Sequence, residues 1–212
     1  KKGESVGLGG ANGGGKSTLL RILVGLNTGF QGDVMVNNIP LEKKNLKTIR
    51  KNIGYVFQNA DSQLFMSTVF DDVAFAPRNY GMSEAEVNEK TMEALKVVHI
   101  EQLKDKQIYK LSGGEKKLAS IATILSTEPD VILMDEPSVA LDPKNRRNLI
   151  NILNRLNQAK IIASHDLNMI MDTCERTILL SDGKIIKDGN TKEILLDKEL
   201  MEESGLELPL GY

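Results

Sequence analysis

The sequence contains few of the residues that stabilise small secreted proteins. It has no tryptophan, one cysteine, and only 4% aromatic residues among its 212 residues. A single cysteine excludes an internal disulfide framework and is typical of a reducing compartment. Cys174 stands at the end of an apolar stripe with helical spacing. We therefore interpret it as a small core residue without a chemical role.

A strong net charge and a long apolar run are also absent. The formal charge is −2 and the pI is near 5.8, which gives no electrostatic reason to expect nucleic acid as a partner. No apolar run approaches the roughly 18 residues of a membrane span. The opening residues, Lys1-Lys2-Gly3-Glu4, do not lead into the apolar stretch of a signal peptide. We expect a soluble chain that folds as one large globular domain.

The clearest positive feature is the stretch GANGGGKST, Gly10 to Thr18, which fits the pattern G-x-x-x-x-G-K-[ST]. Residues 4–8 before it are typical of a short buried strand, and the apolar residues after it predict a helix. In that context Lys16 is expected to reach the β and γ phosphates of a nucleotide, and Ser17 to bind Mg²⁺. A glycine-rich turn without a ligand is the alternative. The predicted nucleotide-binding residues of this loop are Gly10, Ala11, Asn12, Gly13, Gly14, Gly15, Lys16, Ser17 and Thr18.

Two adjacent carboxylates follow a second apolar run. Residues 131–134, VILM, predict a strand buried on both faces, and Asp135-Glu136 stand at its C-terminal end. Carboxylates in such a place are costly unless a cation or a proton-transfer role offsets the burial. We expect Asp135 to bind Mg²⁺, directly or through water, and Glu136 to polarise the water that attacks the γ-phosphate.

Two further polar residues stand at predicted strand ends. Gln58 follows the apolar run at 53–57, and His165 follows the one at 160–164. Ligands in open α/β sheets bind at the C-terminal ends of the strands. His165 is therefore a candidate γ-phosphate contact, although a structural histidine remains the alternative.

Glycines precede a helix a second time at Leu111 to Glu115, LSGGE. Ser112, Gly113 and Gly114 would form a second anion site, and one triphosphate rarely needs two such sites in one chain. A head-to-tail dimer, in which this site serves the ligand of another copy, accounts for it. An ordinary Ser-Gly-Gly turn with a helix cap is the alternative for this pentapeptide alone.

These motifs, in this order, resemble the nucleotide-binding domain of an ABC transporter over essentially the whole chain, 1–212. The motifs are GANGGGKST, Gln58, LSGGE, VILMDEP, SVALD and ASHD. The resemblance implies an α/β fold: a P-loop NTPase core whose mainly parallel sheet is flanked by helices, with a small helical subdomain at about 68–127. It also implies that further N-terminal strands, and an aromatic residue that stacks on adenine, precede Lys1.

The same resemblance assigns roles to single residues. Glu136, His165 and Gln58 would be catalytic, and Ser17, Gln58 and Asp135 would hold Mg²⁺ beside bound ATP. Ser112, Gly113, Gly114 and the helix-starting Asp142 would contact the ATP of a second ABC ATPase subunit, identical or related.

A narrower resemblance concerns Val56 to Gly81, which is similar to the ATPases of cobalt, nickel and vitamin uptake systems of the energy-coupling-factor type. It implies a peripheral subunit on the cytoplasmic face of the membrane, with transmembrane partners docking near Gln58–Gly81. Within this segment we expect Leu64 and Phe65 to be exposed for docking, and Val69 and Phe75 to fill the subdomain core.

Other classes of function remain as alternatives. An ABC ATPase of another transporter class would share all the motifs. A DNA-repair or chromosome ATPase of the same superfamily would need long coiled coils between Lys16 and Ser112, where the chain has no long heptad array. A module that does not hydrolyse ATP would not need Glu136 and His165.

Overall fold

The computed structural model describes residues 3–210, and the chain divides into two compact units. The first unit comprises Lys1–Tyr55, Asp130–Ser138 and Asn157–Tyr212, as far as these segments are described. The second comprises Val56–Pro129 and Val139–Leu156. The chain thus leaves the first unit and returns to it twice.

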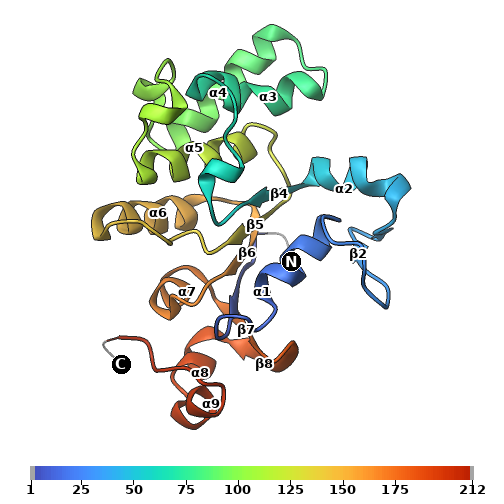
Figure 1. Cartoon of the computed structure of the whole chain (residues 1–212), viewed down its shortest axis with the longest axis vertical. Helices are drawn as coiled ribbons and strands as arrows, with labels where there is room; N and C mark the ends of the chain where they lie inside the picture. The colour runs from blue at the N-terminus through green and yellow to red at the C-terminus, as the bar shows by residue number, and fades with distance from the viewer. Residues whose placement is uncertain (1–2, 211–212) are drawn as a thin grey trace. The chain divides into compact units, whose positions relative to one another are not determined.

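The first unit is built on a six-stranded sheet with the order β4-β5-β6-β1-β7-β8 (Figure 1). β1 pairs in parallel with β6 and β7, β5 pairs in parallel with β6, and β8 runs antiparallel to β7. The strands are β1 (Ser5–Gly9), β4 (Ile53–Val56), β5 (Val131–Asp135), β6 (Ala159–Ala163), β7 (Arg176–Ser181) and β8 (Lys184–Asn190). The mainly parallel sheet predicted from the sequence is confirmed.

The strand register aligns the ends of the central strands. Ala163 of β6 is the partner of both Leu8 in β1 and Asp135 in β5. Parallel strands in this register release their following residues at one sheet edge. The loop after β1, the residue after β5 and the residues after β6 therefore start side by side.

Several helices of this unit pack on the sheet. α1 packs against β5 and β6, α7 packs against β1, and α8 packs against β7 and β8. Between α1 and β4 the chain forms a two-stranded sheet, a short 3-10 turn and α2. The elements of this unit outside the six-stranded sheet are α1 (Lys16–Leu23), β2 (Met35–Val36), β3 (Ile39–Pro40), η1 (Lys43–Asn45), α2 (Leu46–Asn52), α7 (Leu167–Thr173), α8 (Thr191–Leu195) and α9 (Lys198–Glu203).

The second unit is helical among its described residues. α3, α4 and α5 pack on one another, and two of the helices begin with a complete capping box: Ser83 with Glu86 at α4, and Ser112 with Glu115 at α5. Its elements are η2 (Ala60–Ser62), α3 (Val69–Asn79), α4 (Glu84–Val97), η3 (Glu101–Leu103), η4 (Ile108–Lys110), α5 (Gly113–Leu125) and α6 (Pro143–Arg155). A helical subdomain with boundaries near 68 and 127 stays a prediction.

Two of the expectations for the segment before α4 are wrong. Leu64 is buried, whereas Phe75 is 38% exposed. Phe65 is 64% exposed and Val69 is buried, as expected. The reason is local: Phe75 stacks edge-to-face on Phe65, with ring centroids 4.8 Å apart, so the two rings share one surface.

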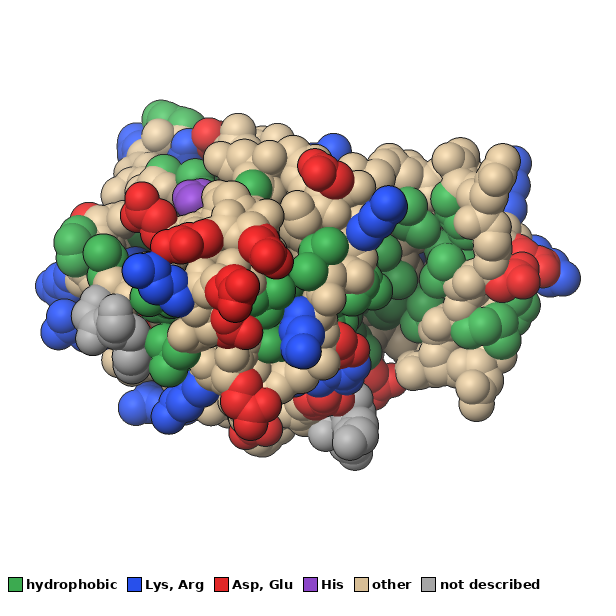
Figure 2. Space-filling model, turned by 90° about the horizontal axis from the view of Figure 1, so that it is seen from below, with side chains coloured by type: hydrophobic (Ala, Val, Ile, Leu, Met, Phe, Trp, Pro, Cys, Tyr) green, Lys and Arg blue, Asp and Glu red, His purple; other side chains and the backbone are tan. Residues whose placement is uncertain are grey.

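The C-terminal segment carries exposed acidic side chains. Figure 2 shows one face of the molecule on which Asp and Glu side chains gather among scattered lysines and arginines. Four glutamates of α8 and α9 are exposed: Glu193, Glu199, Glu202 and Glu203. The last two residues, Gly211 and Tyr212, lie outside the described residues. Within residues 3–210, no helix combines the length and apolar character needed to cross a membrane.

Candidate functional site

The loop between β1 and α1 depends on its glycines. Gly13 and Gly15 have φ values of 83° and 96°, where a side chain would be strained. A Cβ on Gly10 would collide with the carbonyl oxygen of Leu180. α1 starts at Lys16, and its N-cap Gly15 provides no side-chain cap among the described residues. The first N–H groups of α1 are therefore arranged as in helix N-termini that bind phosphate.

Lys16 is folded back on this loop. Its Nζ donates to the carbonyl oxygens of Gly10 at 2.7 Å and Ala11 at 3.0 Å, and lies 3.9 Å from Oε1 of Glu136. Burial lowers the pKa of Lys16, while the negative charges of Glu136 and Asp135 act in the opposite direction. The ammonium group is thus a buried cation at the sheet edge where the carboxylates stand.

Asp135 is fully buried and both of its carboxylate oxygens accept hydrogen bonds. The Ser17 hydroxyl donates to Oδ1 at 2.7 Å, and the Tyr55 hydroxyl donates to Oδ2 at 3.1 Å. Burial and the nearby Asp135 charge raise the pKa of Tyr55 to about 12, so the phenol keeps its proton. The pair of Ser17 and Asp135 predicted from the sequence is brought together, and Tyr55 is an additional member.

Glu136 is held by the residues that follow β6. Its carboxylate accepts from the Ser164 hydroxyl at 3.0 Å and from the backbone N–H of His165 at 3.0 Å. Nδ1 of His165 lies 2.8 Å from Oε2 of Glu136, and the imidazole side chain is 50% exposed. Glu136 itself has a φ of 47°, a strained value for a residue with a side chain. The two catalytic candidates therefore contact each other directly.

Sequence reasoning missed Tyr55 and Ser164. Tyr55 lies in an apolar strand that is buried throughout, and Ser164 sits between an apolar strand and His165. The available signal was chemical rather than periodic: a hydroxyl in a buried strand needs a hydrogen-bond partner, and the adjacent carboxylates are the nearest strong acceptors.

The segment that begins with Gln58 belongs to the second unit. The Gln58 side chain is exposed, while its carbonyl oxygen accepts from Nζ of Lys117 at 2.8 Å. Gln63 accepts from the N–H of Phe57 at 3.1 Å and donates to the carbonyl of Ser120 at 2.7 Å. The start of this segment is thus attached to α5.

The start of α5 lies in the same unit and is tightly built. Ser112 caps α5 by accepting from the N–H of Glu115 at 3.2 Å, and the Glu115 carboxylate accepts from the N–H of Ser112 at 2.7 Å. Gly114 is buried, and a Cβ there would lie 2.7 Å from Nδ2 of Asn145. Asp142 caps α6 by accepting from the N–H of Asn145 at 2.8 Å, and this bond lowers the Asp142 pKa.

The structure therefore groups the predicted residues by unit. The first unit brings together the loop from Gly10 to Thr18, Asp135, Glu136 and His165. Gln58, Ser112 to Gly114 and Asp142 lie in the second unit. Within residues 3–210, no group of three or more His, Cys, Asp or Glu side chains is placed to hold a metal ion.

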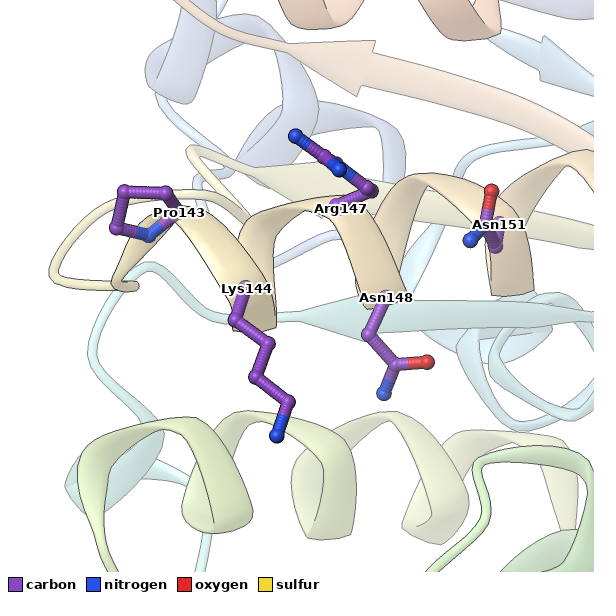
Figure 3. A pocket seen from close by; sticks show the side chains of 5 residues that line it. All are labelled: Pro143, Lys144, Arg147, Asn148 and Asn151. Carbon is purple, nitrogen blue, oxygen red and sulfur yellow. The ribbon is translucent and has the colours of Figure 1, made fainter.

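A separate pocket of about 350 Å³ lies along α6 (Figure 3). Pro143, Lys144, Arg147, Asn148 and Asn151 line it, all from one helix. None of these residues is among the predicted site residues, so the pocket adds nothing to the site described above.

Comparisons with known proteins bear on this geometry. The family model described as ABC transporter matches residues 1–139. The chain belongs to the ABC transporter family. A putative ABC transporter ATP-binding protein of Geobacter sulfurreducens is 48% identical over 99% of this chain and 84% of the relative. The energy-coupling factor transporter ATP-binding protein EcfA of Carboxydothermus hydrogenoformans is 41% identical over 95% of this chain and 75% of the length of EcfA.

Solved structures agree with the fold of this ABC ATPase. CbiO1 of Clostridium perfringens, part of the transporter complex CbiONQ, superposes with a TM-score of 0.85 at 36% identity, covering 96% of this chain and 83% of CbiO1. The dimeric ATP-binding cassette MJ0796, bound to ADP and Pi in a post-hydrolysis state, superposes with a TM-score of 0.80 at 31% identity. The match covers 90% of this chain and 87% of the MJ0796 chain. The P-loop NTPase fold, the ATPase class and the role as a transporter subunit are confirmed.

Proposed function

We propose that this ABC ATPase hydrolyses MgATP to drive an importer of a metal ion, such as cobalt or nickel, or of a vitamin. The names of EcfA and CbiO1, together with the resemblance of Val56 to Gly81, support this transporter class. The observation that carries the hydrolytic part is the meeting of Lys16, Ser17, Asp135, Glu136 and His165 at one sheet edge.

The residues at this edge fit Mg²⁺ bound with a nucleotide. Ser17 and Asp135 offer a hydroxyl and a carboxylate oxygen 2.7 Å apart, and Mg²⁺ commonly takes one or two such protein ligands beside substrate phosphates and waters. Bound Mg²⁺ would neutralise charge on the phosphate oxygens. Gln58 is the third proposed ligand, on the resemblance alone.

Different groups of this chain then have different roles in hydrolysis. The N–H groups of the loop Gly10 to Thr18 bind phosphate oxygens, and Lys16 exchanges its contacts with two loop carbonyls for contacts with the β and γ phosphates. Glu136 orients and polarises the attacking water, and His165, which contacts Glu136, is placed to stabilise charge on the γ-phosphate.

A second subunit completes the proposed site. Ser112 and Gly113 are exposed at the start of α5, and Asp142 is exposed at the start of α6. These residues, together with the buried Gly114 between them and the rest of α5, are proposed to contact ATP held by another ABC ATPase subunit, which would give a head-to-tail dimer with two shared sites. The dimeric state of the MJ0796 cassette supports this arrangement.

The proposed docking surface for membrane subunits is the aromatic pair of Phe65 and Phe75. Both rings are exposed, and the loop that carries Phe65 is fixed by Asp72, whose buried carboxylate accepts the N–H groups of Phe65 at 3.2 Å and Met66 at 3.1 Å. An exposed aromatic pair on a rigid loop suits an apolar helix of a partner. The chain would then be a peripheral subunit on the cytoplasmic face of the membrane.

Two experiments test these proposals. ATP turnover should be measurable for the wild-type chain and roughly 10²- to 10³-fold lower in Lys16→Ala. A turnover equal in both would contradict the hydrolytic site. Uptake should then be measured in cells or vesicles that contain the native membrane subunits, with cobalt, nickel and vitamins supplied in turn.

The docking surface is tested by Phe65→Ser and Phe75→Ser, which should release the subunit from its membrane partners. Tyr109→Ser serves as the matched control, since Tyr109 is an exposed aromatic residue of the same unit. Normal co-purification of the Phe65→Ser/Phe75→Ser protein with its membrane partners would place the docking surface elsewhere.

A further inference from the structure

Tyr55 places a phenol beside the carboxylates of this site. It lies in β4, the neighbour of β5 in the sheet, and its hydroxyl reaches Oδ2 of Asp135 at 3.1 Å. Both side chains are buried, Asp135 completely. The contact therefore joins a strand that otherwise carries no predicted site residue to the proposed Mg²⁺ ligand.

The two oxygens of Asp135 have different donors. Ser17 donates to Oδ1 and Tyr55 donates to Oδ2, so rotation of the carboxylate would break both hydrogen bonds. Arg21, one turn after Ser17 on α1, lowers the pKa of Tyr55 and so opposes the larger effects of burial and of the Asp135 charge.

We infer that Tyr55 is a positioning residue: it holds the Asp135 carboxylate with Oδ1 toward Ser17, and Asp135 and Ser17 are the residues that would hold the divalent cation. Mg²⁺ tolerates little departure from octahedral geometry, so a freely rotating carboxylate is a poorer ligand than a fixed one. Partners of ligating carboxylates typically change metal affinity by roughly 10- to 100-fold when they are removed. This inference rests on the Mg²⁺ site of the proposed function.

The test is the Mg²⁺ dependence of ADP binding, measured by calorimetry on the full chain. The informative quantity is the ratio of ADP affinities with and without Mg²⁺, because it does not require turnover. Tyr55→Phe keeps the ring and removes only the hydroxyl. It should reduce the gain from Mg²⁺ by roughly 10-fold, the lower end of the range for such partners, and leave Mg²⁺-free ADP binding unchanged.

Two comparison variants are measured in the same way as Tyr55→Phe. Ser17→Ala should abolish the gain from Mg²⁺, and Tyr109→Phe, which removes an exposed hydroxyl bonded to Gln107, should leave it at the wild-type value. If Ser17→Ala abolishes the gain and Tyr55→Phe retains it in full, the inference is overturned and the Mg²⁺ site stands. An equal loss of ADP affinity with and without Mg²⁺ in Tyr55→Phe would also overturn it. A wild-type chain that gains nothing from Mg²⁺ overturns both.

A measurement on the native side chain guards against a variant that does not fold. The chain has four tyrosines, so fluorotyrosine labelling gives four ¹⁹F resonances, and Phe variants of the other three identify that of Tyr55. This resonance should shift when Mg²⁺ is added to the ADP-bound protein, because a bound cation changes the acceptor strength of Asp135. An unchanged Tyr55 resonance on Mg²⁺ binding would overturn the inference.

Discussion

Two helices begin at glycines, and they differ in how the N–H groups of the first turn are satisfied: α1 directly follows Gly15, whereas Gly113 and Gly114 are the first two residues of α5. At α1 the N-cap is Gly15, and no side chain of the described residues caps the helix. At α5 Ser112 and Glu115 cap each other's backbone. The N–H groups at the start of α1 are left for a ligand, whereas the capping box at α5 satisfies the N–H groups of Ser112 and Glu115 and does not include those of Gly113 and Gly114.

Glycines at a helix start can therefore serve two different roles in one chain. The α1 loop is suited to gain its last hydrogen bonds from phosphate oxygens, and Lys16 meanwhile bonds to the loop's own carbonyls. The α5 start is rigid and exposed at Ser112 and Gly113, which suits a surface that must meet a ligand held by another subunit.

The largest expected effect separates the two starts by function. Lys16→Ala should lower turnover by roughly 10²- to 10³-fold, the usual cost of losing one donor to a developing oxyanion. It should also weaken ATP binding to a single chain, whereas Ser112→Ala should leave single-chain binding unchanged. Calorimetric ATP titrations at low protein concentration, together with a phosphate-release assay, measure both. Weaker ATP binding to a single chain in Ser112→Ala would contradict the proposal that Ser112 contacts only the ATP of another subunit.

The next effect concerns the assembly that the α5 start is proposed to serve. Glu136→Gln keeps the shape of the side chain but removes the carboxylate, so ATP should remain bound and the dimer should persist. Light scattering with ATP should then report about twice the single-chain mass. Adding Ser112→Arg should return the mass to that of one chain. A double variant that still dimerises would show that α5 is not at the interface.

A smaller effect tests the packing behind the second start. Gly114→Ala places a methyl group against the Asn145 side chain and should destabilise the fold by about 1–3 kcal/mol, the usual range for overpacking. Chemical denaturation measures this loss. Adding Asn145→Ala should restore part of the loss by making room, and Gly113→Ala, whose Cβ would have ample space, is the control.

The smallest effect concerns the cap itself. Glu115→Ala should cost about 1 kcal/mol, the scale of a helix cap. Glu86→Ala at α4, the other capping box, is the matched comparison. Hydrogen bonds from the Ser112 N–H, together with Lys106, lower the pKa of Glu115 below its ordinary 4.5, against the opposing effect of burial.

The sign of the pH dependence follows from this lowered pKa. The unfolded chain binds the proton more readily, so the Glu115 contribution is complete above about pH 4.5 and is lost as the pH falls through the folded pKa. The difference in unfolding free energy between wild type and Glu115→Ala should therefore shrink below pH 4.5. A difference that stays constant from pH 7 to pH 3 would show that the charge of Glu115 contributes nothing.

The sheet, the phosphate-binding loop, and the placement of Asp135, Glu136 and His165 at one edge follow from patterns in the amino-acid sequence. Buried apolar runs identify parallel strands, and parallel strands in register end at the same edge, so residues that follow them must meet. The helix caps were also readable, because a capping box is a local pattern.

Which hydroxyls donate to the carboxylates, and which apolar side chains are exposed, depends on contacts between residues far apart in the chain. Tyr55 and Ser164 meet Asp135 and Glu136 across different strands, and no local pattern encodes such a contact. Leu64 is buried because burial in a loop depends on where its backbone is held, and Phe75 of α3 is partly exposed because its ring packs on the exposed ring of Phe65. Here Asp72 holds that backbone, seven residues along the chain from the N–H of Phe65 that it accepts.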